Sequence, residues 1–358
     1  MKKGRFIAAL LAVVWASACG DDGGGASSSE ADAGVDAASM DTGGGDDSGA
    51  AADTAEASDT TEASDTAEAQ DTAEELPWPV EATALVEGVF GSSEGIAFNG
   101  EGTLFVVADT DLWTVTPEGE VTAVADLENP VGLASIGDRD ILVGEFGPLS
   151  FTEDGPNDDG SVLRVTPEGE VTVVATGIGD PNFIHPRDDG SLLVTDDFTD
   201  IIYEVSPDGE VGVFLQGIQS PNGLVESLDR SELYVAQTFS SVDPLGLDRR
   251  VWRVALDGDG RPVGEPELLH EVEGLGANDG VTLDAQGRLY VAANLDGNVW
   301  RIDPTDGSAV LIAEGLVSIA SLAFGEGAFD GETIYATQLF GGAVWAIEVG
   351  VAGAPVAR

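Results

Sequence analysis

Four polar side chains at matching positions of a repeated pattern carry the chemistry that this sequence could perform. They are Glu94, Asn182, Asn222 and Asp279, and each is the second residue of a short, largely apolar stretch. Two carboxylates and two carboxamides offer hard oxygen atoms, and no His or Cys stands at these positions. Such a ligand set suits Ca²⁺ or Mg²⁺ better than Zn²⁺ or Cu²⁺. The four residues therefore predict a divalent metal site, with Ca²⁺ expected first and Mg²⁺, Mn²⁺ or Zn²⁺ as alternatives.

The elements that must position these residues are six copies of a three-strand pattern within 77–358. Its most regular element is a short strand, which is often followed by Pro and by a turn made of an acidic residue and Gly. The six copies of that element are 111–117, 161–167, 201–207, 251–255, 298–304 and 343–349. A second apolar strand precedes each of them, and turns such as Glu118-Gly119 supply the positive φ that a tight hairpin needs. No stretch shows a helical period of useful length.

Six units in 282 residues give 47 residues each, which is typical of a four-stranded propeller blade. The last unit lacks its own outer strand, and the stretch at about 82–88 can supply it and leave no open edge. The sequence therefore predicts an all-β fold, a six-bladed β-propeller of four-stranded blades in which the N-terminal strand completes blade 6. A two-sheet sandwich would not account for six matched triplets.

In a propeller, the first strand of each blade lines the central channel, so equivalent positions face one shared cavity. Alignment of the six first strands places Glu94, Val131, Asn182, Asn222, Asp279 and Ala320 at one such position. Asn-Gly and Asp-Gly are also common turn dipeptides, which is the alternative interpretation of 222–223 and 279–280. Glu94 favours the metal site, because Glu is a poor turn former and occupies the same register.

The strings at 93–95, 221–224 and 278–292 resemble the regucalcin/gluconolactonase family (SGL, senescence marker protein type), over essentially all of 82–349. The resemblance implies a six-bladed propeller with one catalytic divalent metal, usually Ca²⁺, on the channel axis. It implies that Glu94, Asn222 and Asp279 are metal ligands and that Asp279 is the general base. It also implies that Asn182 lies near the metal and contacts the substrate or a metal-bound water.

The expected activity is a metal-dependent hydrolysis of a small-molecule lactone or ester, in which the cation polarises the carbonyl group. Asp180 stands where the sugar-lactone enzymes of the family carry an Arg, so the substrate class stays open. Two alternatives remain at this stage. One is a non-catalytic propeller that binds a small molecule or a protein around a structural metal, and the other is phosphotriesterase or lyase activity in the same site.

Two insertions and two histidines complete the candidates. The insertions, 145–160 and 237–250, follow the second strand of their units and are expected on the metal's face, as pocket walls or as plain surface loops. His185 lies three residues past Asn182 and could face the channel, although a buried core histidine is the commoner case. His270 is expected to be solvated in an outer strand.

The N-terminal part of the chain has the features of an exported lipoprotein. Residues 1–18 combine three cationic residues, a short apolar run and a small-residue cleavage site before Cys19, the single cysteine. This segment resembles a bacterial lipobox, which implies lipidation of Cys19; the alternative is an ordinary secretory signal. Residues 19–76 hold 17 acidic and no basic side chains, which predicts a disordered tether. We expect a chain anchored by lipid in the cell envelope, on the outer membrane and facing the periplasm or the surface.

The net charge of −52 excludes several partners. It disfavours nucleic acid and anionic lipid headgroups, so that membrane contact is expected only through Cys19. All but 17 of the 66 acidic residues lie in 77–358, against 11 arginines, so most of the imbalance belongs to the expected propeller. We expect this domain to be a monomer.

Overall fold

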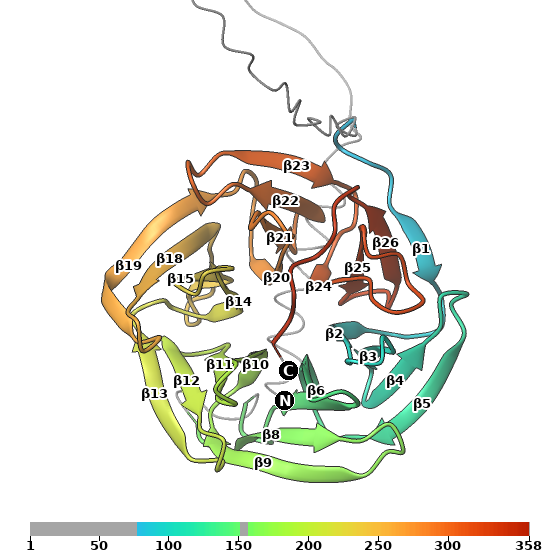
Figure 1. The fold of residues 1–358 in the computed structure, drawn as a ribbon, viewed down its shortest axis with the longest axis horizontal. Coiled ribbons are helices and arrows are strands. Elements are labelled where there is room, and N and C mark those ends of the chain that lie inside the picture. Colours follow the sequence, from blue (N-terminus) through green and yellow to red (C-terminus); the bar gives the residue numbers. More distant parts are fainter. Residues whose placement is uncertain (1–76, 151–156, 358) are drawn as a thin grey trace, which may run out of the picture. The chain divides into compact units, whose positions relative to one another are not determined.

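In the computed structural model, residues 77–150 and 157–357 are described, and they form six four-stranded antiparallel sheets around a central channel (Figure 1). Blade 1 consists of β2 (Ser93–Phe98), β3 (Leu104–Ala108), β4 (Asp111–Val115) and β5 (Val121–Asp126). Blade 2 consists of β6 (Pro130–Ile136), β7 (Asp140–Glu145), β8 (Gly160–Val165) and β9 (Val171–Ile178). Blade 3 consists of β10 (Pro181–Pro186), β11 (Leu192–Asp196), β12 (Ile201–Val205) and β13 (Val211–Gln216).

The other three blades follow the same order, from an inner strand at the channel to an outer strand at the rim. Blade 4 consists of β14 (Pro221–Glu226), β15 (Glu232–Gln237), β18 (Arg250–Leu256) and β19 (Pro262–Glu271). Blade 5 consists of β20 (Asn278–Leu283), β21 (Leu289–Ala293), β22 (Asn298–Ile302) and β23 (Ala309–Ala313). Blade 6 consists of β24 (Ile319–Phe324), β25 (Thr333–Gln338), β26 (Val344–Glu348) and β1 (Thr83–Val86). The predicted six-bladed propeller is confirmed.

The ring is closed by the first strand of the described chain. β1 pairs antiparallel with β26, with Thr83 opposite Ala346 and Val86 opposite Val344, and Figure 1 shows the two strands side by side. Blade 6 thus has its fourth strand, and each of the six blades in the described residues has four strands. The predicted closure by 82–88 is confirmed, with the strand itself covering 83–86.

The hydrophobic core lies between neighbouring blades. Leu112 of blade 1 and Ile141 of blade 2 are fully buried in one shared cluster, and Tyr290 of blade 5 packs against Phe324 of blade 6 with ring centroids 5.6 Å apart. Alternating side chains of the two middle strands in each blade supply these contacts, since successive residues of a strand point to opposite faces. Burial of six such clusters holds the inner strands in place around the channel.

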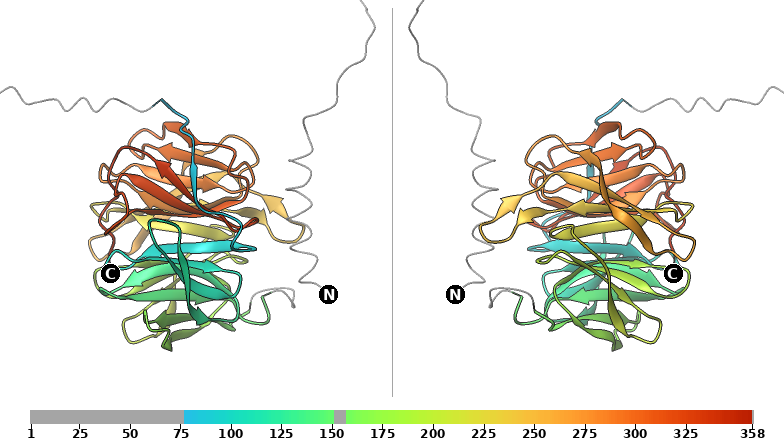
Figure 2. Two further views of the ribbon diagram at one scale, coloured as in Figure 1. Left: turned by 90° about the vertical axis from the view of Figure 1, so that its right-hand side faces the viewer. Right: turned by 90° about the vertical axis from the view of Figure 1, so that its left-hand side faces the viewer.

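The two ends of the channel differ. The insertion at 237–250 contains a short hairpin, β16 (Phe239–Ser241) with β17 (Gly246–Leu247), which projects from one face of the ring in Figure 2. The C-terminal tail, residues 350–357, lies at the opposite face and runs across the centre of the ring. Its backbone is bonded to blade 5, where Ala285 N donates to Ala352 O at 2.8 Å and Ala354 N to Leu283 O at 2.9 Å.

The signal peptide predicted at 1–18, the lipidation site Cys19 and the tether predicted at 19–76 lie outside the described residues. In the part of the chain that the structure describes, there is no helix long and apolar enough to cross a membrane.

Candidate functional site

A shared irregularity of the six inner strands shapes one end of the channel. In each blade, the register between the inner strand and its neighbour shifts after the first residue of the inner strand, as between Ser93 and Ile96 in blade 1 or Asn278 and Val281 in blade 5. Such a bulge leaves two residues out of the regular ladder and turns their side chains. The second residue of the inner strand is therefore released from pairing in all six blades.

Glycines at the third position bring the bulges of neighbouring blades into contact. A Cβ on Gly132 of β6 would lie 1.7 Å from the main-chain oxygen of Asn182, and a Cβ on Gly223 of β14 would lie 2.5 Å from that of Asp279. Distances this short exclude any side chain, so the backbones of adjacent inner strands touch at this level.

The four predicted site residues all occupy this level. Glu94, Asn182, Asn222 and Asp279 are the second residues of β2, β10, β14 and β20. Glu94 is half-buried, whereas the other three are between 3% and 6% exposed. The Asp279 carboxylate accepts a hydrogen bond at Oδ2 from Asn294 Nδ2 at 2.9 Å, which orients it. The structure thus places these residues at equivalent positions around the axis.

Buried carboxylates lie close to one another at this level. Burial, followed by the negative charges of Asp279 and Asp197, raises the pKa of Glu94 well above its usual range. Burial also raises the pKa of Asp279 to about 7, although hydrogen bonds from Asn294 and the Gly280 backbone oppose the shift. Raised carboxylate pKa values of this kind are common at functional sites, where a cation or a proton relieves the repulsion.

Sequence reasoning missed two residues of this level, Asp197 and Asn294. Each directly follows the second strand of its blade, and its backbone N–H bonds to the residue that precedes the inner strand, at 3.0 Å for Asp197 and 3.2 Å for Asn294. The pKa of Asp197 is raised by burial and by Asp279, and a hydrogen bond with the Asn182 side chain opposes this. An alignment of the residues that follow each second strand would have found both.

The donor set fits a hard divalent cation. Asn222 Oδ1 and Asp197 Oδ1 are buried and have no hydrogen-bond partner, which leaves oxygen lone pairs available at the same level as the Glu94 and Asp279 carboxylates. Within the described ranges, no three side chains of the His, Cys, Asp and Glu types are grouped so as to hold a metal by themselves. The carboxamide oxygens of Asn182 and Asn222 would therefore be needed as ligands.

The mouth above this level is formed at the second-strand ends, where both insertions emerge. Pro130 pairs with Glu145 and Pro221 with Gln237, so the segments after 145 and after 237 leave the blades beside the starts of the inner strands. The Thr238 hydroxyl donates to Asn278 O at 2.8 Å and thereby links the second insertion to blade 5. Both insertions lie on the predicted face, and residues 151–156 of the first are outside the described ranges.

Asp180 is buried against the first insertion. Its carboxylate is 2% exposed and accepts a hydrogen bond from Asn157 Nδ2 at 2.9 Å, in the first insertion. Burial raises its pKa to about 6, and Asp196 and Asp159 add to the shift. The side chain at the position of the expected Arg is thus bonded to the first insertion.

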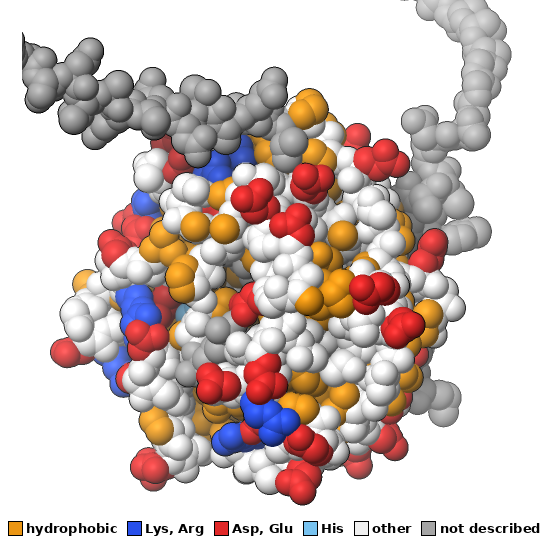
Figure 3. All heavy atoms as spheres, turned by 45° about the vertical axis from the view of Figure 1, so that its right-hand side comes forward, with side chains coloured by type: hydrophobic (Ala, Val, Ile, Leu, Met, Phe, Trp, Pro, Cys, Tyr) orange, Lys and Arg blue, Asp and Glu red, His pale blue; other side chains and the backbone are white. Residues whose placement is uncertain are grey.

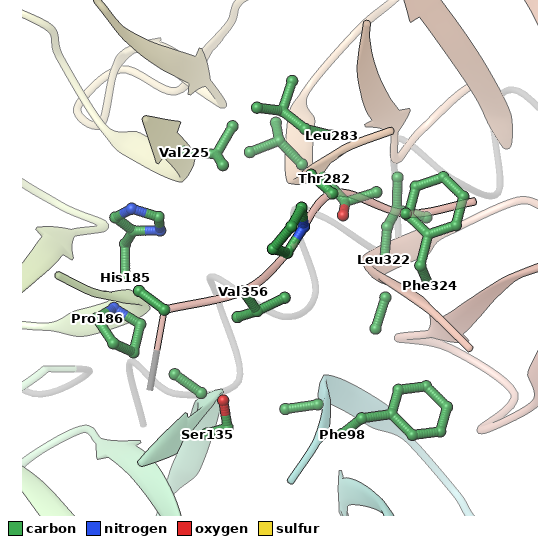
Figure 4. Close-up of a pocket in the computed structure, with 18 of the residues that line it drawn as sticks. Phe98, Ser135, His185, Pro186, Val225, Thr282, Leu283, Leu322, Phe324 and Val356 are labelled. Atoms are coloured by element: carbon green, nitrogen blue, oxygen red, sulfur yellow. The ribbon is translucent and has the colours of Figure 1, made fainter. Parts of the chain in front are cut away.

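A cavity of about 560 Å³ occupies the other end of the channel. It is lined by the later residues of the inner strands, and the tail residue Val356 lies in its middle (Figure 4). His185 lines this cavity, three residues beyond Asn182 on β10, with its Nε2 atom 3.8 Å from Glu226 Oε2. His185 therefore faces the channel at the end away from Glu94.

His270 departs in part from expectation. It lies in the outer strand β19, as predicted, but it is half-buried, and its Nδ1 is 2.9 Å from Gly307 O of blade 5. The expectation of a solvated side chain was wrong, because the hairpin turn of the next blade packs against it.

Acidic side chains are spread over the face that Figure 3 shows. Figure 3 shows Asp and Glu over much of one face, with few Arg among them. Several of the arginines are paired on the surface, as Arg164 Nε is with Asp140 Oδ2 at 2.6 Å. Acidic side chains on this face would repel a phosphate backbone.

Comparison with known proteins agrees with this architecture. The fold is similar to regucalcin, a calcium-binding protein from Agrobacterium tumefaciens, with a TM-score of 0.62, 22% identity and coverage of 78% of this chain and 98% of that one. It is similar to a gluconolactonase from Xanthomonas campestris, with a TM-score of 0.59, 18% identity and coverage of 76% and 89%. Virginiamycin B lyase from Staphylococcus aureus has a TM-score of 0.52, 14% identity and coverage of 75% and 99%.

No curated protein sequence matches the chain. The model of the SMP-30/gluconolactonase/LRE-like region matches residues 93–339, which contain all four predicted ligands and most of the ring. The chain is therefore a member of the SMP-30/gluconolactonase/LRE-like (SGL) family, and its propeller is lactonase-like.

Proposed function

We propose that this chain is a divalent-metal-dependent hydrolase of the lactonase or esterase kind. The metal site would consist of Glu94, Asn182, Asn222 and Asp279, and Ca²⁺ is the preferred ion. The observation that supports the proposal is the arrangement of four oxygen-bearing side chains at one level of the channel, with Asn222 Oδ1 buried and without a partner. Four protein ligands leave positions for a substrate, because Ca²⁺ takes six to eight oxygen ligands.

The chain's own residues have distinct tasks in this proposal. A divalent ion bound there supplies Lewis-acid polarisation of the substrate carbonyl. Asp279 is the general base: Asn294 Nδ2 donates to its Oδ2 and orients the carboxylate, which accepts the proton of the attacking water. The water oxygen bonds to the carbonyl carbon, the ester C–O bond breaks, and Asp279 returns the proton to the leaving oxygen. The product is a hydroxy acid, or an acid and an alcohol.

The surroundings of the site favour a neutral substrate. Asp197 adds a third carboxylate at the level of Glu94 and Asp279, and the expected sugar-binding Arg is replaced by Asp180. A phosphorylated or carboxylated substrate would be repelled at this mouth. Neutral lactones and aryl esters are the substrates to test first.

The test uses the full chain, freed of metal by a chelator and then given Ca²⁺, Mg²⁺, Mn²⁺ or Zn²⁺. Turnover is measured against neutral lactones, aryl esters and phosphotriesters. We expect ion-dependent hydrolysis in the lactone or ester class and a loss of at least 100-fold in kcat for Asp279→Asn, the range of general acid-base contributions. Glu118→Gln, in an exposed turn, is the matched control and retains activity.

Two outcomes would contradict the proposal. Ca²⁺ binding without turnover in any class would indicate the non-catalytic alternative, a propeller with a structural metal. Turnover confined to phosphotriesters, or elimination products without hydrolysis, would assign the site to the phosphotriesterase or lyase alternative.

We also propose that Cys19 anchors the chain to the cell envelope, on the evidence of the lipobox-like segment before it. The expected result is a lipid-modified N-terminal cysteine by mass spectrometry and membrane association that Cys19→Ala abolishes. A processed chain with an unmodified Cys19 would refute the anchor and leave the proposed hydrolase unaffected.

A further inference from the structure

A second cluster of buried oxygen atoms lies between blade 3 and the first insertion, away from the channel axis. Asp180 directly precedes β10 and is 2% exposed, and Asp196 ends β11 and is fully buried. Asn157 belongs to the insertion and precedes β8. The three residues come from two blades and meet at one place, because the start of β10 pairs with the end of β11 through Pro181 and Asp196.

Several oxygens of this cluster have no hydrogen-bond partner. Asn157 Nδ2 donates to Asp180 Oδ2 at 2.9 Å, and Phe198 N donates to Asp196 Oδ1 at 3.1 Å. The other oxygen of each side chain, namely Asp180 Oδ1, Asp196 Oδ2 and Asn157 Oδ1, is buried and unpartnered. A buried polar atom without a partner is costly, so three of them together require an explanation.

Gly179 lies close to these atoms. A Cβ on this residue would lie 2.2 Å from Asp196 Oδ2 and 3.3 Å from the main-chain oxygen of Asn157. Both oxygens therefore border the volume that any larger residue would fill. Oxygen atoms of Asp196 and Asn157, from two chain segments, thus approach the backbone next to Asp180.

The cluster also lacks a counter-charge. The ion pairs of Asp and Glu with cationic side chains in the described ranges involve neither Asp180 nor Asp196. Asp159, whose Oδ2 accepts from Leu149 N at 2.8 Å, adds a further carboxylate from the same insertion. Buried carboxylates are paired with a cation or coordinate a metal ion, because an isolated buried charge is unfavourable by several kcal/mol.

We propose that Asp180, Asp196 and Asn157 form a second, structural cation site, separate from the axial site, and that it takes Ca²⁺. The donors are carboxylate, carboxamide and main-chain oxygens, which are the ligands of Ca²⁺, and water completes the coordination. The bound ion joins the first insertion to blade 3 beside the channel mouth. Asp180 then acts as a ligand of this ion and not as a contact for substrate.

The test is calorimetric titration of the chelator-treated full chain with Ca²⁺, with the axial site disabled in one arm. We expect two ions for the wild type, one for Asp279→Asn, one for Asp196→Asn and none for the double variant. Asp208→Asn, in an exposed turn of the same blade, is the control and binds two ions. If the double variant still binds one Ca²⁺ ion, as Asp279→Asn is expected to, the proposal is overturned.

The two sites can fail independently. If the wild type binds one ion, and Asp196→Asn loses it while Asp279→Asn keeps it, the second site is supported and the axial site is refuted. If Asp279→Asn loses that ion and Asp196→Asn keeps it, the second site alone is overturned. Thermal melting separates a ligand from a merely structural residue. With chelator, Asp196→Asn should melt at or above the wild-type temperature, since it removes repulsion, whereas Ca²⁺ should stabilise it less than it stabilises the wild type. A melting temperature lowered equally with and without Ca²⁺ would contradict the proposal.

Discussion

Replacement of Asp279 by Asn should stabilise the metal-free protein at pH 8 and remove much of its response to Ca²⁺. The pKa of Asp279 is about 7 in the folded protein, because the carboxylate is buried, against 3.8 for the free side chain. Below about pH 4, Asp279 is protonated in both the folded and the unfolded state, and its burial causes no charge penalty. As the pH rises towards 7, the unfolded chain loses this proton while the folded protein keeps it, so the free energy of unfolding decreases, and the loss is complete above pH 7. Asn carries no charge at any pH and keeps the acceptor for Asn294 Nδ2, which is 2.9 Å away.

The magnitude follows from the difference between the two pKa values. About three pH units correspond to about 4 kcal/mol as an upper bound for the metal-free protein at pH 8. In a protein of this size that amounts to a rise on the order of 10 °C in Tm. At pH 5 the protonated Asp279 is already neutral, so the substitution should change Tm little.

The assay is thermal unfolding followed by circular dichroism at pH 5 and pH 8, with chelator or with Ca²⁺. Asp208→Asn, whose side chain is exposed, is the control and should match the wild type in all four conditions. A variant that is destabilised equally at both pH values would refute the reasoning, since it would mean that Asp279 acts through its hydrogen bonds rather than its charge. An undiminished Ca²⁺ response would show that Asp279 is not a ligand.

Three further predictions concern other parts of the propeller. Gly132→Ala should destabilise the fold by about 1–3 kcal/mol or more in chemical denaturation, because its Cβ would lie 1.7 Å from a main-chain oxygen, whereas Gly212→Ala, with no atom within 4 Å, should be near neutral. Arg187→Met should cost about 3–5 kcal/mol, because it leaves the buried Glu226 without the Nε donor that is 2.8 Å away, and Glu226→Gln in the same chain should recover part of the loss. Removal of 355–357 should increase binding of an apolar fluorescent dye to the 560 Å³ cavity, and unchanged fluorescence would contradict the tail's role as its wall.

The common level of the four candidate ligands could be predicted from the sequence because these residues share one position of a repeat. Glu94 and Asp279 stand second in strands whose flanking patterns match, so an alignment of the repeats places them at one level without any knowledge of contacts. Asp197 and Asn294 reach that level from the ends of second strands. Their placement depends on the pairing of the two strands across a bulge, so the pattern of the inner strands does not indicate it, and only an alignment of the second-strand ends would.

Contacts between blades were the other part that could not be predicted. The bond between His270 and the Gly307 carbonyl joins the outer strand of one blade to a turn of the next. The path of the C-terminal tail has no periodic pattern, so neither its position across the channel nor its pairing with Leu283 could be inferred. Such contacts depend on how the blades pack together, whereas the pattern within a blade specifies the blade alone.

The pairing of β1 with β26 has a consequence for the order in which the chain folds. Thr83 meets Ala346, so blade 6 cannot be completed until nearly the whole described chain is available, and its formation carries the entropic cost of a very long loop. Until then, the edge of β26 is exposed and can pair with β1 of a second molecule. At high concentration, refolding should therefore produce exchanged dimers in which each molecule completes the other's ring. Refolding at low protein concentration should favour the closed monomer.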